Sequence, residues 1–185
     1  SESHVAAIGG ITTMMRMLRL GDSYRNSLLA QLNASSNSHY VDYAIHASIF
    51  NLKQADDMQY CLENGVASFK LYMNLGGEVG HVYMDMKPDE NLLQEERVEV
   101  TSEVIQKVVK NASLLGCPVL VHAEDYEQCG CGIKKAKEKN QDGLDAWSES
   151  RSTKSEIKSI QTISKFARDA NCVLYFAHIG SRHAL

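Results

Sequence analysis

Residues 65–73 read Gly-Val-Ala-Ser-Phe-Lys-Leu-Tyr-Met, which places one lysine inside an otherwise apolar, β-prone run. The large neighbours Phe69 and Leu71 predict a strand that is buried on both faces, as strands of parallel sheets usually are. A buried ammonium group is costly unless it is paired, neutralised or chemically modified. The sequence therefore predicts that another group, or a modification, compensates Lys70.

Strand-like and helix-like segments alternate on both sides of this run. Apolar, β-prone segments occupy residues 11–17, 40–49, 67–73, 117–122 and 172–178. Helical patterns occupy residues 3–8, 22–32, 52–63, 101–115, 126–140 and 154–170, the second of them opened by Asp22 as N-cap. Residues 33–38 and 141–155 are predicted as polar connections, and residues 76–98 as a long loop with a short hairpin. This order predicts an α/β protein with five parallel strands, in a barrel or an open sheet.

Composition excludes several classes of function. The 185 residues carry a formal charge of -4, and their densest basic run, Lys134 to Lys137, is expected to be the solvated face of a helix. No stretch approaches the roughly 18 apolar residues of a membrane span, and the first residues lack a signal-peptide pattern. Five cysteines at scattered spacings favour reduced thiols. We therefore expect a cytoplasmic protein with no nucleic-acid or membrane partner.

Three predicted strands contain or end in a polar residue that buried strands normally avoid: Lys70, His122 and His178. The carboxyl ends of parallel strands meet on one side of the sheet, so these side chains are expected to face one cavity. Two histidines and an anionic group suit a zinc-like ion. A lysine carbamylated by carbon dioxide is anionic and can bridge two metals. On spacing alone, hydrogen-bonded core histidines and a snorkelling lysine remain alternatives.

The residues themselves resemble a known family. Residues 65–73 resemble the carbamylated-lysine strand of the cyclic amidohydrolases, the group that holds dihydroorotases, hydantoinases (dihydropyrimidinases) and allantoinases. Residues 116–125 resemble the family's fifth-strand histidine segment, and residues 177–181 its sixth-strand histidine and turn. Residues 6–13 resemble the helix, Gly-Gly and strand that enter its second strand. Residues 148–156 are similar to its Ser-Arg-Pro…Glu segment, with Ser152 where proline is usual.

The resemblance implies a (β/α)8 barrel with a two-metal site, usually zinc. On this mapping Lys70 bridges both metals as a carbamate and acts in catalysis, while His122 and His178 complete the more buried metal site. A metal-bridging hydroxide then attacks the carbonyl of a cyclic amide. The resemblance thus implies a hydrolase of cyclic C–N bonds with a small-molecule substrate, and we expect it to be a homo-oligomer.

The departures from the family pattern are equally informative. The family's first-strand His-x-His is absent, and its eighth-strand aspartate would lie beyond Leu185. A complete barrel of this type needs about 250 residues. We therefore expect residues 1–185 to form a single incomplete barrel domain that covers strands two to six and lacks the first strand and the last two. Such a domain would expose two sheet edges and be inactive alone. The substrate ring is not indicated, because residues 17–19 and Leu75 match no subgroup signature.

Two rival interpretations come from other classes. Some relatives of the hydantoinases keep the barrel, lose metal ligands and act as scaffold or assembly proteins; retention of Lys70 and both histidines disfavours that role here. An open nucleotide-binding sheet is disfavoured because no Gly-x-Gly-x-x-Gly or Walker-type loop is present. Two finer expectations concern the site. From the alternation of side chains along a strand, we expect Tyr72 to point away from Lys70. We expect residues 124–125 either to orient a ligand or to cap a helix.

Overall fold

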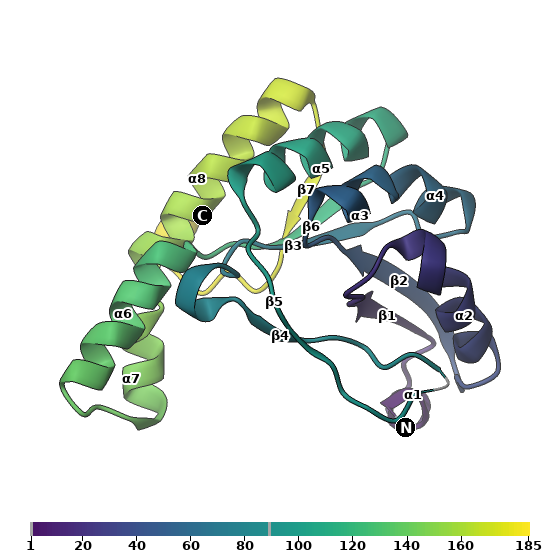
Figure 1. Cartoon of the computed structure of the whole chain (residues 1–185), viewed down its shortest axis with the longest axis horizontal. Coiled ribbons are helices and arrows are strands. Elements are labelled where there is room, and N and C mark those ends of the chain that lie inside the picture. The colour runs from purple at the N-terminus through teal and green to yellow at the C-terminus, as the bar shows by residue number, and fades with distance from the viewer. Residues whose placement is uncertain (1, 89) are drawn as a thin grey trace.

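The computed structural model describes residues 2–88 and 90–185, and at its centre lies a five-stranded parallel sheet in the order β1-β2-β3-β6-β7 (Figure 1). These strands are β1 (Thr13–Leu18), β2 (Asp42–Ser48), β3 (Phe69–Tyr72), β6 (Val119–His122) and β7 (Leu174–Phe176). All four neighbouring pairs are parallel. The α/β class and the five parallel strands predicted from the sequence are thus confirmed, with β1 and β7 at the two edges of the sheet.

Helices alternate with these strands along the chain. They are α1 (Glu2–Ile8), α2 (Tyr24–Ser36), α3 (Leu52–Asp56), α4 (Met58–Glu63), α5 (Ser102–Leu115), α6 (Tyr126–Glu138), α7 (Gly143–Ser150) and α8 (Thr153–Ala170), with short 3-10 turns η1 (Gly77–Val79) and η2 (Arg182–Ala184). Figure 1 shows α6 and α7 as a paired arm that extends away from the sheet. Within the described residues, no helix has the length and apolar character that a membrane span requires.

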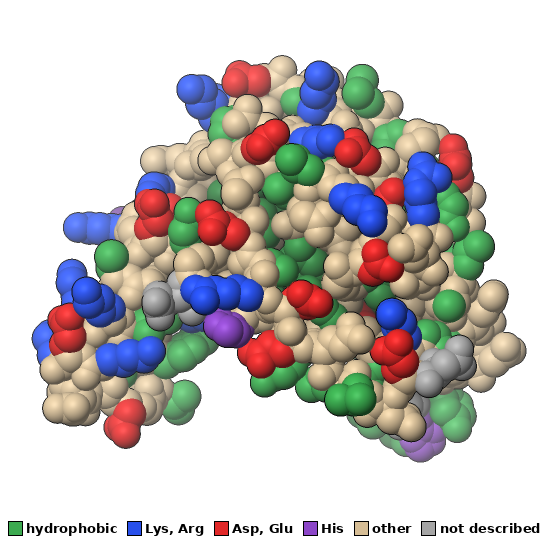
Figure 2. Space-filling view, in the orientation of Figure 1, with side chains coloured by type: hydrophobic (Ala, Val, Ile, Leu, Met, Phe, Trp, Pro, Cys, Tyr) green, Lys and Arg blue, Asp and Glu red, His purple; other side chains and the backbone are tan. Residues whose placement is uncertain are grey.

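The hairpin expected between residues 76 and 98 is present. Its strands, β4 (His81–Tyr83) and β5 (Glu95–Arg97), pair antiparallel as a separate two-stranded sheet. Asp89 belongs to the same predicted loop and lies outside the described residues. Over the face drawn in Figure 2, acidic and basic side chains are interspersed, and several basic ones gather on the arm at the lower left.

The two faces of the parallel sheet differ in their covering. Residues such as Leu18, Phe69 and Val121 are fully buried against the helices. On the opposite face Met15 is 54% exposed and Tyr175 is 65% exposed, beside an apolar groove of about 680 Å³. Burial on both faces is therefore confirmed for the central strands β3 and β6 and wrong for the edge strands β1 and β7, because helices of the described chain cover one face only.

Two predicted helices keep nearly the limits expected because their ends carry clear capping residues. Helix α5 begins after Thr101, whose side chain accepts a hydrogen bond from the Val104 N–H, and ends at Gly116 in the left-handed conformation (φ 66°). Helix α8 begins after Ser152 and ends at Asn171, which is also left-handed. The apolar periodicity that predicted both helices corresponds to side chains buried in the core.

Helix α2 is longer than predicted and starts one residue later. Its N-cap position is Ser23 rather than Asp22, and it continues to Ser36 through part of the predicted loop. The polar residues Ser27, Gln31 and Ser35 recur at helical spacing and are buried. Gln31 donates a hydrogen bond to the Met86 carbonyl at 2.8 Å. The helical period of this segment is thus carried by polar residues, which an apolar pattern does not detect.

Helix α7 forms where a polar connection was expected. Its large apolar side chains, Leu144 and Trp147, are 85% and 61% exposed, so no apolar stripe marks the helix in the sequence. It packs on α6 through backbone instead: a Cβ on Gly132 would lie 2.5 Å from the Ser150 carbonyl oxygen. This close approach explains why α6 tolerates a glycine in its interior.

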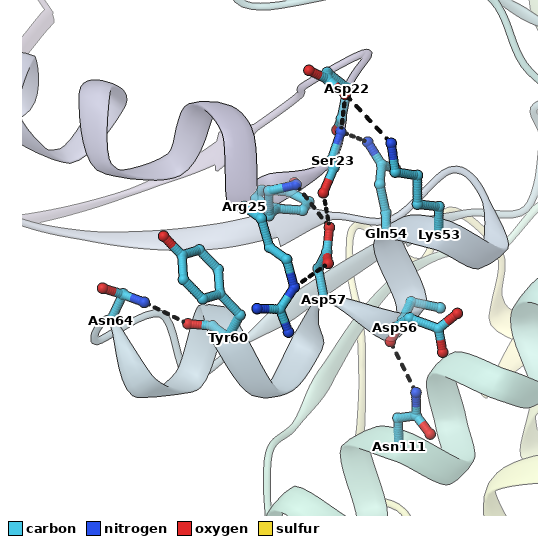
Figure 3. A network of polar contacts seen from close by, with 12 residues as sticks. Asp22, Ser23, Arg25, Lys53, Gln54, Asp56, Asp57, Tyr60, Asn64 and Asn111 are labelled. Atoms are coloured by element: carbon cyan, nitrogen blue, oxygen red, sulfur yellow. Dashed lines mark hydrogen bonds and ion pairs between the residues drawn. The ribbon is translucent and has the colours of Figure 1, made fainter.

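The predicted helix 52–63 is divided at Asp57, whose carboxylate organises the start of α2 (Figure 3). Asp57 accepts hydrogen bonds from the Ser23 hydroxyl at 2.5 Å, from the Tyr24 N–H at 2.9 Å and from Arg25 Nε at 3.1 Å. The side chain of Asp57 is nearly buried. A carboxylate from the turn between α3 and α4 therefore caps α2, which the local sequence of α2 does not reveal.

We expect Asp57→Ala to lower the free energy of unfolding by about 3 kcal/mol, because the change leaves buried donors of α2 without an acceptor. The neighbouring Asp56→Ala is the matched control. Asp56 pairs with Lys107 at 2.6 Å on the surface, and its loss should cost less than about 1 kcal/mol. Urea unfolding of both variants measures the difference, and equal destabilisation would contradict this role of Asp57.

Candidate active site

Two histidines meet at the carboxyl ends of β6 and β7. His122 is the last residue of β6, and His178 follows β7 by two residues with a positive φ of 40°. His122 Nδ1 and His178 Nε2 lie 3.0 Å apart, and the ring planes are inclined by 65°. Two ring nitrogens that face each other at this distance can share one proton or bind one cation. The structure thus brings together two of the three polar strand residues.

Lys70, the third of these residues, is buried in β3 and is only 1% exposed. No ion pair involving Lys70 occurs within the part of the chain that the structure describes. Burial lowers the pKa of its ammonium group to about 8 from 10.5. A substantial fraction of Lys70 is therefore neutral in mildly alkaline solution, and a neutral amine is the form that reacts with electrophiles such as carbon dioxide.

Tyr72 is a neighbour of both Lys70 and His122. Lys70 Nζ is 4.9 Å from the centre of the Tyr72 ring, and that ring is 6.3 Å from the His122 ring. The expectation that Tyr72 points away from Lys70 is wrong, because residues two apart in a strand share one face. The aromatic face of Tyr72 stabilises the cation in place of a carboxylate.

A cavity of about 610 Å³ opens beside the histidine pair. Six of the residues that line it are Asn74, His122, Trp147, Arg151, His178 and Ser181. Lys70 does not line it, so the expected convergence of all three residues on one cavity is only partly present. Asn74 Oδ1, Arg151 Nε and Ser181 Oγ are buried and have no hydrogen-bond partner among the residues that the structure describes. These atoms are available to the polar groups of a bound molecule.

Glu124 connects the histidine pair to the arm. Its Oε2 accepts hydrogen bonds from His122 Nε2 at 2.6 Å and from Arg151 Nη1 at 2.5 Å. Burial alone would raise the pKa of Glu124, but the hydrogen bond from His122 and the charge of Arg151 outweigh burial and lower that pKa. Asp125 instead caps α6 by accepting from the Gln128 N–H. Asp125 therefore has the capping role considered for residues 124–125, and the orienting role stays a prediction for Glu124, which contacts the His122 ring.

The donor set near the histidines limits what could hold a metal. Within residues 2–88 and 90–185, no group of three or more His, Cys, Asp and Glu side chains is arranged to bind a metal ion. The two facing imidazole nitrogens are suitable donors, since neutral imidazole is a common zinc ligand. A third ligand from this region would have to be of another type, and a carbamate on Lys70 has that chemistry.

Sequence reasoning gave no specific role to Arg151, Asn74 or Trp147. Arg151 lies within the segment that resembles the family's Ser-Arg…Glu pattern, so this resemblance could have marked it as a site residue. Its contact with Glu124 spans 27 residues and depends on the arm. The ring of Trp147 lies 4.9 Å from the Arg151 guanidinium carbon. Nothing in the sequence except its residue type marks Trp147 as a site residue.

Comparison with known proteins places this site in context. No protein-family model matches the sequence. An allantoinase of Escherichia coli O9:H4 (strain HS) is 26% identical over 184 residues, which covers 97% of this chain and 37% of the relative. An allantoinase of Solibacter usitatus (strain Ellin6076) is 32% identical over 73 residues, which covers 40% of this chain and 16% of the relative. Nearly the whole length of this chain is therefore similar in sequence to an allantoinase.

Solved structures show the same fold. A D-hydantoinase matches with a TM-score of 0.81 and 18% identity over 98% of this chain and 36% of its own. The L-hydantoinase (dihydropyrimidinase) of Arthrobacter aurescens matches with a TM-score of 0.80, 18% identity and coverage of 98% and 37%. The chain therefore spans a little over a third of the Escherichia coli allantoinase and of both hydantoinases. Its fold is an α/β partial barrel, as expected.

The lowered pKa of Lys70 predicts a pH-dependent stability in metal-free, carbonate-free buffer. The folded protein releases the Lys70 proton near pH 8, whereas the unfolded chain holds it up to 10.5, so stability should rise between these values. Lys70→Met removes the buried charge. We expect the variant to be more stable than the wild type by about 2 kcal/mol below pH 8, after allowance for solvent screening.

This advantage of Lys70→Met should vanish above about pH 10.5. Urea unfolding at several pH values measures it. Lys110→Met, at an exposed position of α5, is the control and should show no such dependence. A difference between Lys70→Met and the wild type that stays constant from pH 7 to pH 11 would contradict the lowered pKa.

Proposed function

We propose that the protein carrying this chain is a hydrolase that opens a cyclic amide, with its active site at the carboxyl ends of β3, β6 and β7. The observation that carries the proposal is the pairing of His122 and His178 at 3.0 Å on adjacent strand ends. The sequence match to allantoinases along 97% of the chain supports the same reaction class.

Residues 1–185 contribute one unit of a larger barrel in this proposal. The uncovered sheet face, with its exposed Met15 and Tyr175, supports this arrangement. In a closed (β/α)8 barrel that face lines the interior and is packed by the remaining strands. The likeness to about a third of each hydantoinase chain points the same way.

Lys70, His122 and His178 are the residues proposed to hold metal, with zinc as the proposed ion and two ions in the complete enzyme. Bound there, zinc would generate a nucleophile from water near neutral pH and polarise the ring carbonyl. The neutral amine of Lys70 forms a carbamate when its nitrogen attacks carbon dioxide, making an N–C bond and releasing a proton. The low pKa of Lys70 favours this reaction, and its burial protects the product from water.

The substrate class proposed is a cyclic ureide or imide such as allantoin, hydantoin or a dihydropyrimidine. The cavity of about 610 Å³ has room for such a ring. The buried, unpartnered Asn74 Oδ1 can accept a hydrogen bond from a ring N–H, and Arg151 Nε can donate one to a ring carbonyl. The allantoinase relatives make allantoin the first compound to test.

The alternative is a non-catalytic relative that acts as a scaffold or assembly protein. One observation favours it: the described residues hold no cluster of three conventional metal ligands. The two proposals differ in whether Lys70 becomes a carbamate and whether zinc is bound.

The deciding experiment uses the protein at its full natural length, supplied with zinc and hydrogen carbonate. Hydrolysis of allantoin, hydantoin, dihydrouracil and dihydroorotate is measured alongside zinc content. We expect turnover of at least one ring and a loss of about a hundredfold or more in kcat/KM for Lys70→Ala. Propionate should restore part of the activity of Lys70→Ala by supplying the missing carboxylate, and Lys110→Ala is the control.

A protein that binds no zinc and opens none of the four rings would establish the scaffold alternative. Full activity of Lys70→Ala would exclude the lysine from the reaction. Carbon-13 NMR with labelled hydrogen carbonate observes the carbamate directly, and its signal should be absent from Lys70→Ala.

A further inference from the structure

The junction between α7 and α8 (residues 151–156) contacts the surroundings of both histidines. Arg151 at its start reaches the neighbour of His122, and Glu156 at its end reaches the turn that carries His178. We propose that this α7–α8 junction positions the histidine pair for metal binding. The inference rests on the proposed function, and it assigns a positioning role to Arg151, Glu124 and Glu156, none of which is a proposed metal ligand.

The first contact runs from Arg151 through Glu124 to His122. A single oxygen, Glu124 Oε2, accepts from Arg151 Nη1 at 2.5 Å and from His122 Nε2 at 2.6 Å. The three side chains are 19%, 17% and 22% exposed, so solvent screens these charges only partly. Arg151 is further held by the ring of Trp147. Arg151 thus holds the same oxygen of Glu124 that contacts His122.

This contact selects which nitrogen of His122 is free. When Nε2 donates its proton to Glu124, the neutral ring keeps Nδ1 as its lone-pair donor. Nδ1 is the atom that faces His178 Nε2 at 3.0 Å. Loss of Glu124 or Arg151 would let the His122 ring rotate or change tautomer. The lone pair of Nδ1 would then no longer face His178.

The second contact runs from Glu156 to the turn after β7. Glu156 Oε1 accepts a hydrogen bond from the Gly180 N–H at 2.7 Å. His178, two residues earlier, has a φ of 40°, a conformation that non-glycine residues rarely adopt unless their surroundings impose it. The Glu156 contact restrains the short turn that holds His178 in this conformation.

The junction is itself anchored to the loop after β6. Ser155 is fully buried, and its hydroxyl accepts from the Asp125 N–H at 2.7 Å and donates to the Asp125 carbonyl at 3.2 Å. The Ser152 side chain caps the start of α8. Residues 151–156 and the segment from His122 to Asp125 therefore form one hydrogen-bonded unit, which transmits the position of the junction to both rings.

The test measures zinc affinity by competition with a chelator, in the full-length protein and without reference to turnover. We expect Arg151→Ala, Glu124→Ala and Glu156→Ala each to weaken zinc binding by about tenfold to a hundredfold. Glu124→Gln and Glu156→Gln keep a carbonyl acceptor and should recover most of that loss. Arg168→Ala on α8 and Glu138→Ala on α6 are matched controls that should bind zinc as the wild type does.

Three further readouts separate positioning from general destabilisation. Cobalt(II) in place of zinc should show an altered visible absorption spectrum in Arg151→Ala and Glu124→Ala. Glu156→Ala should speed hydrogen exchange of the Gly180 amide by about tenfold. In a double-mutant cycle, Arg151→Ala should add little in the Glu124→Ala background, because both act through one contact.

The outcomes distinguish this inference from the proposed function. If His122→Ala and His178→Ala bind zinc as tightly as the wild type, the proposed metal site itself fails. If both lose zinc while the Arg151, Glu124 and Glu156 variants bind as the controls do, only the positioning inference is overturned. Additive losses in the double-mutant cycle would likewise overturn it. Circular dichroism establishes that each variant is folded, and the Gln variants serve where an Ala variant unfolds.

Discussion

The parallel register of β3, β6 and β7 is the constraint on which the candidate site depends. Tyr72 lies opposite His122 in this register, and Val121 lies opposite Phe176, so the strands end at one edge of the sheet. A shift by one residue would send His122 to the helix-covered face, because side chains alternate between faces. The apolar residues buried under α5 and α8 oppose such a shift. Core packing therefore fixes the geometry of the polar site.

The buried charge of Lys70 in the same sheet lowers the stability of the folded protein. Lys70 is 1% exposed and has no ion pair within the described part of the chain, so its charge weakens the fold, and the ring of Tyr72 offsets only part of that cost. A group kept at the expense of stability is typical of functional sites. In the proposed enzyme the cost disappears on carbamylation and metal binding, which links the stability of this strand to its chemistry.

The sequence predicted the regular elements wherever local and tertiary preferences agree. Helices α5 and α8 have caps and an apolar stripe, and both were found nearly in place. Prediction failed where packing uses other means. Buried Gln31 carries the period of α2, Asp57 from the turn between α3 and α4 caps it, and α7 packs through the backbone near Gly132. The pattern of apolar residues along the chain predicts none of these three features.

For the site, the sequence by itself determined the residue types and their order: a lysine within one buried strand and histidines at the ends of two others. Residue type and strand parity are local properties, so they can be read along the chain. Only the tertiary structure decided that His122 and His178 meet while Lys70 contacts the ring of Tyr72. It alone also brought Arg151 to Glu124 and Glu156 to Gly180. The two contacts join residues that are 27 and 24 positions apart in the chain, so they depend on packing between segments that are distant in sequence.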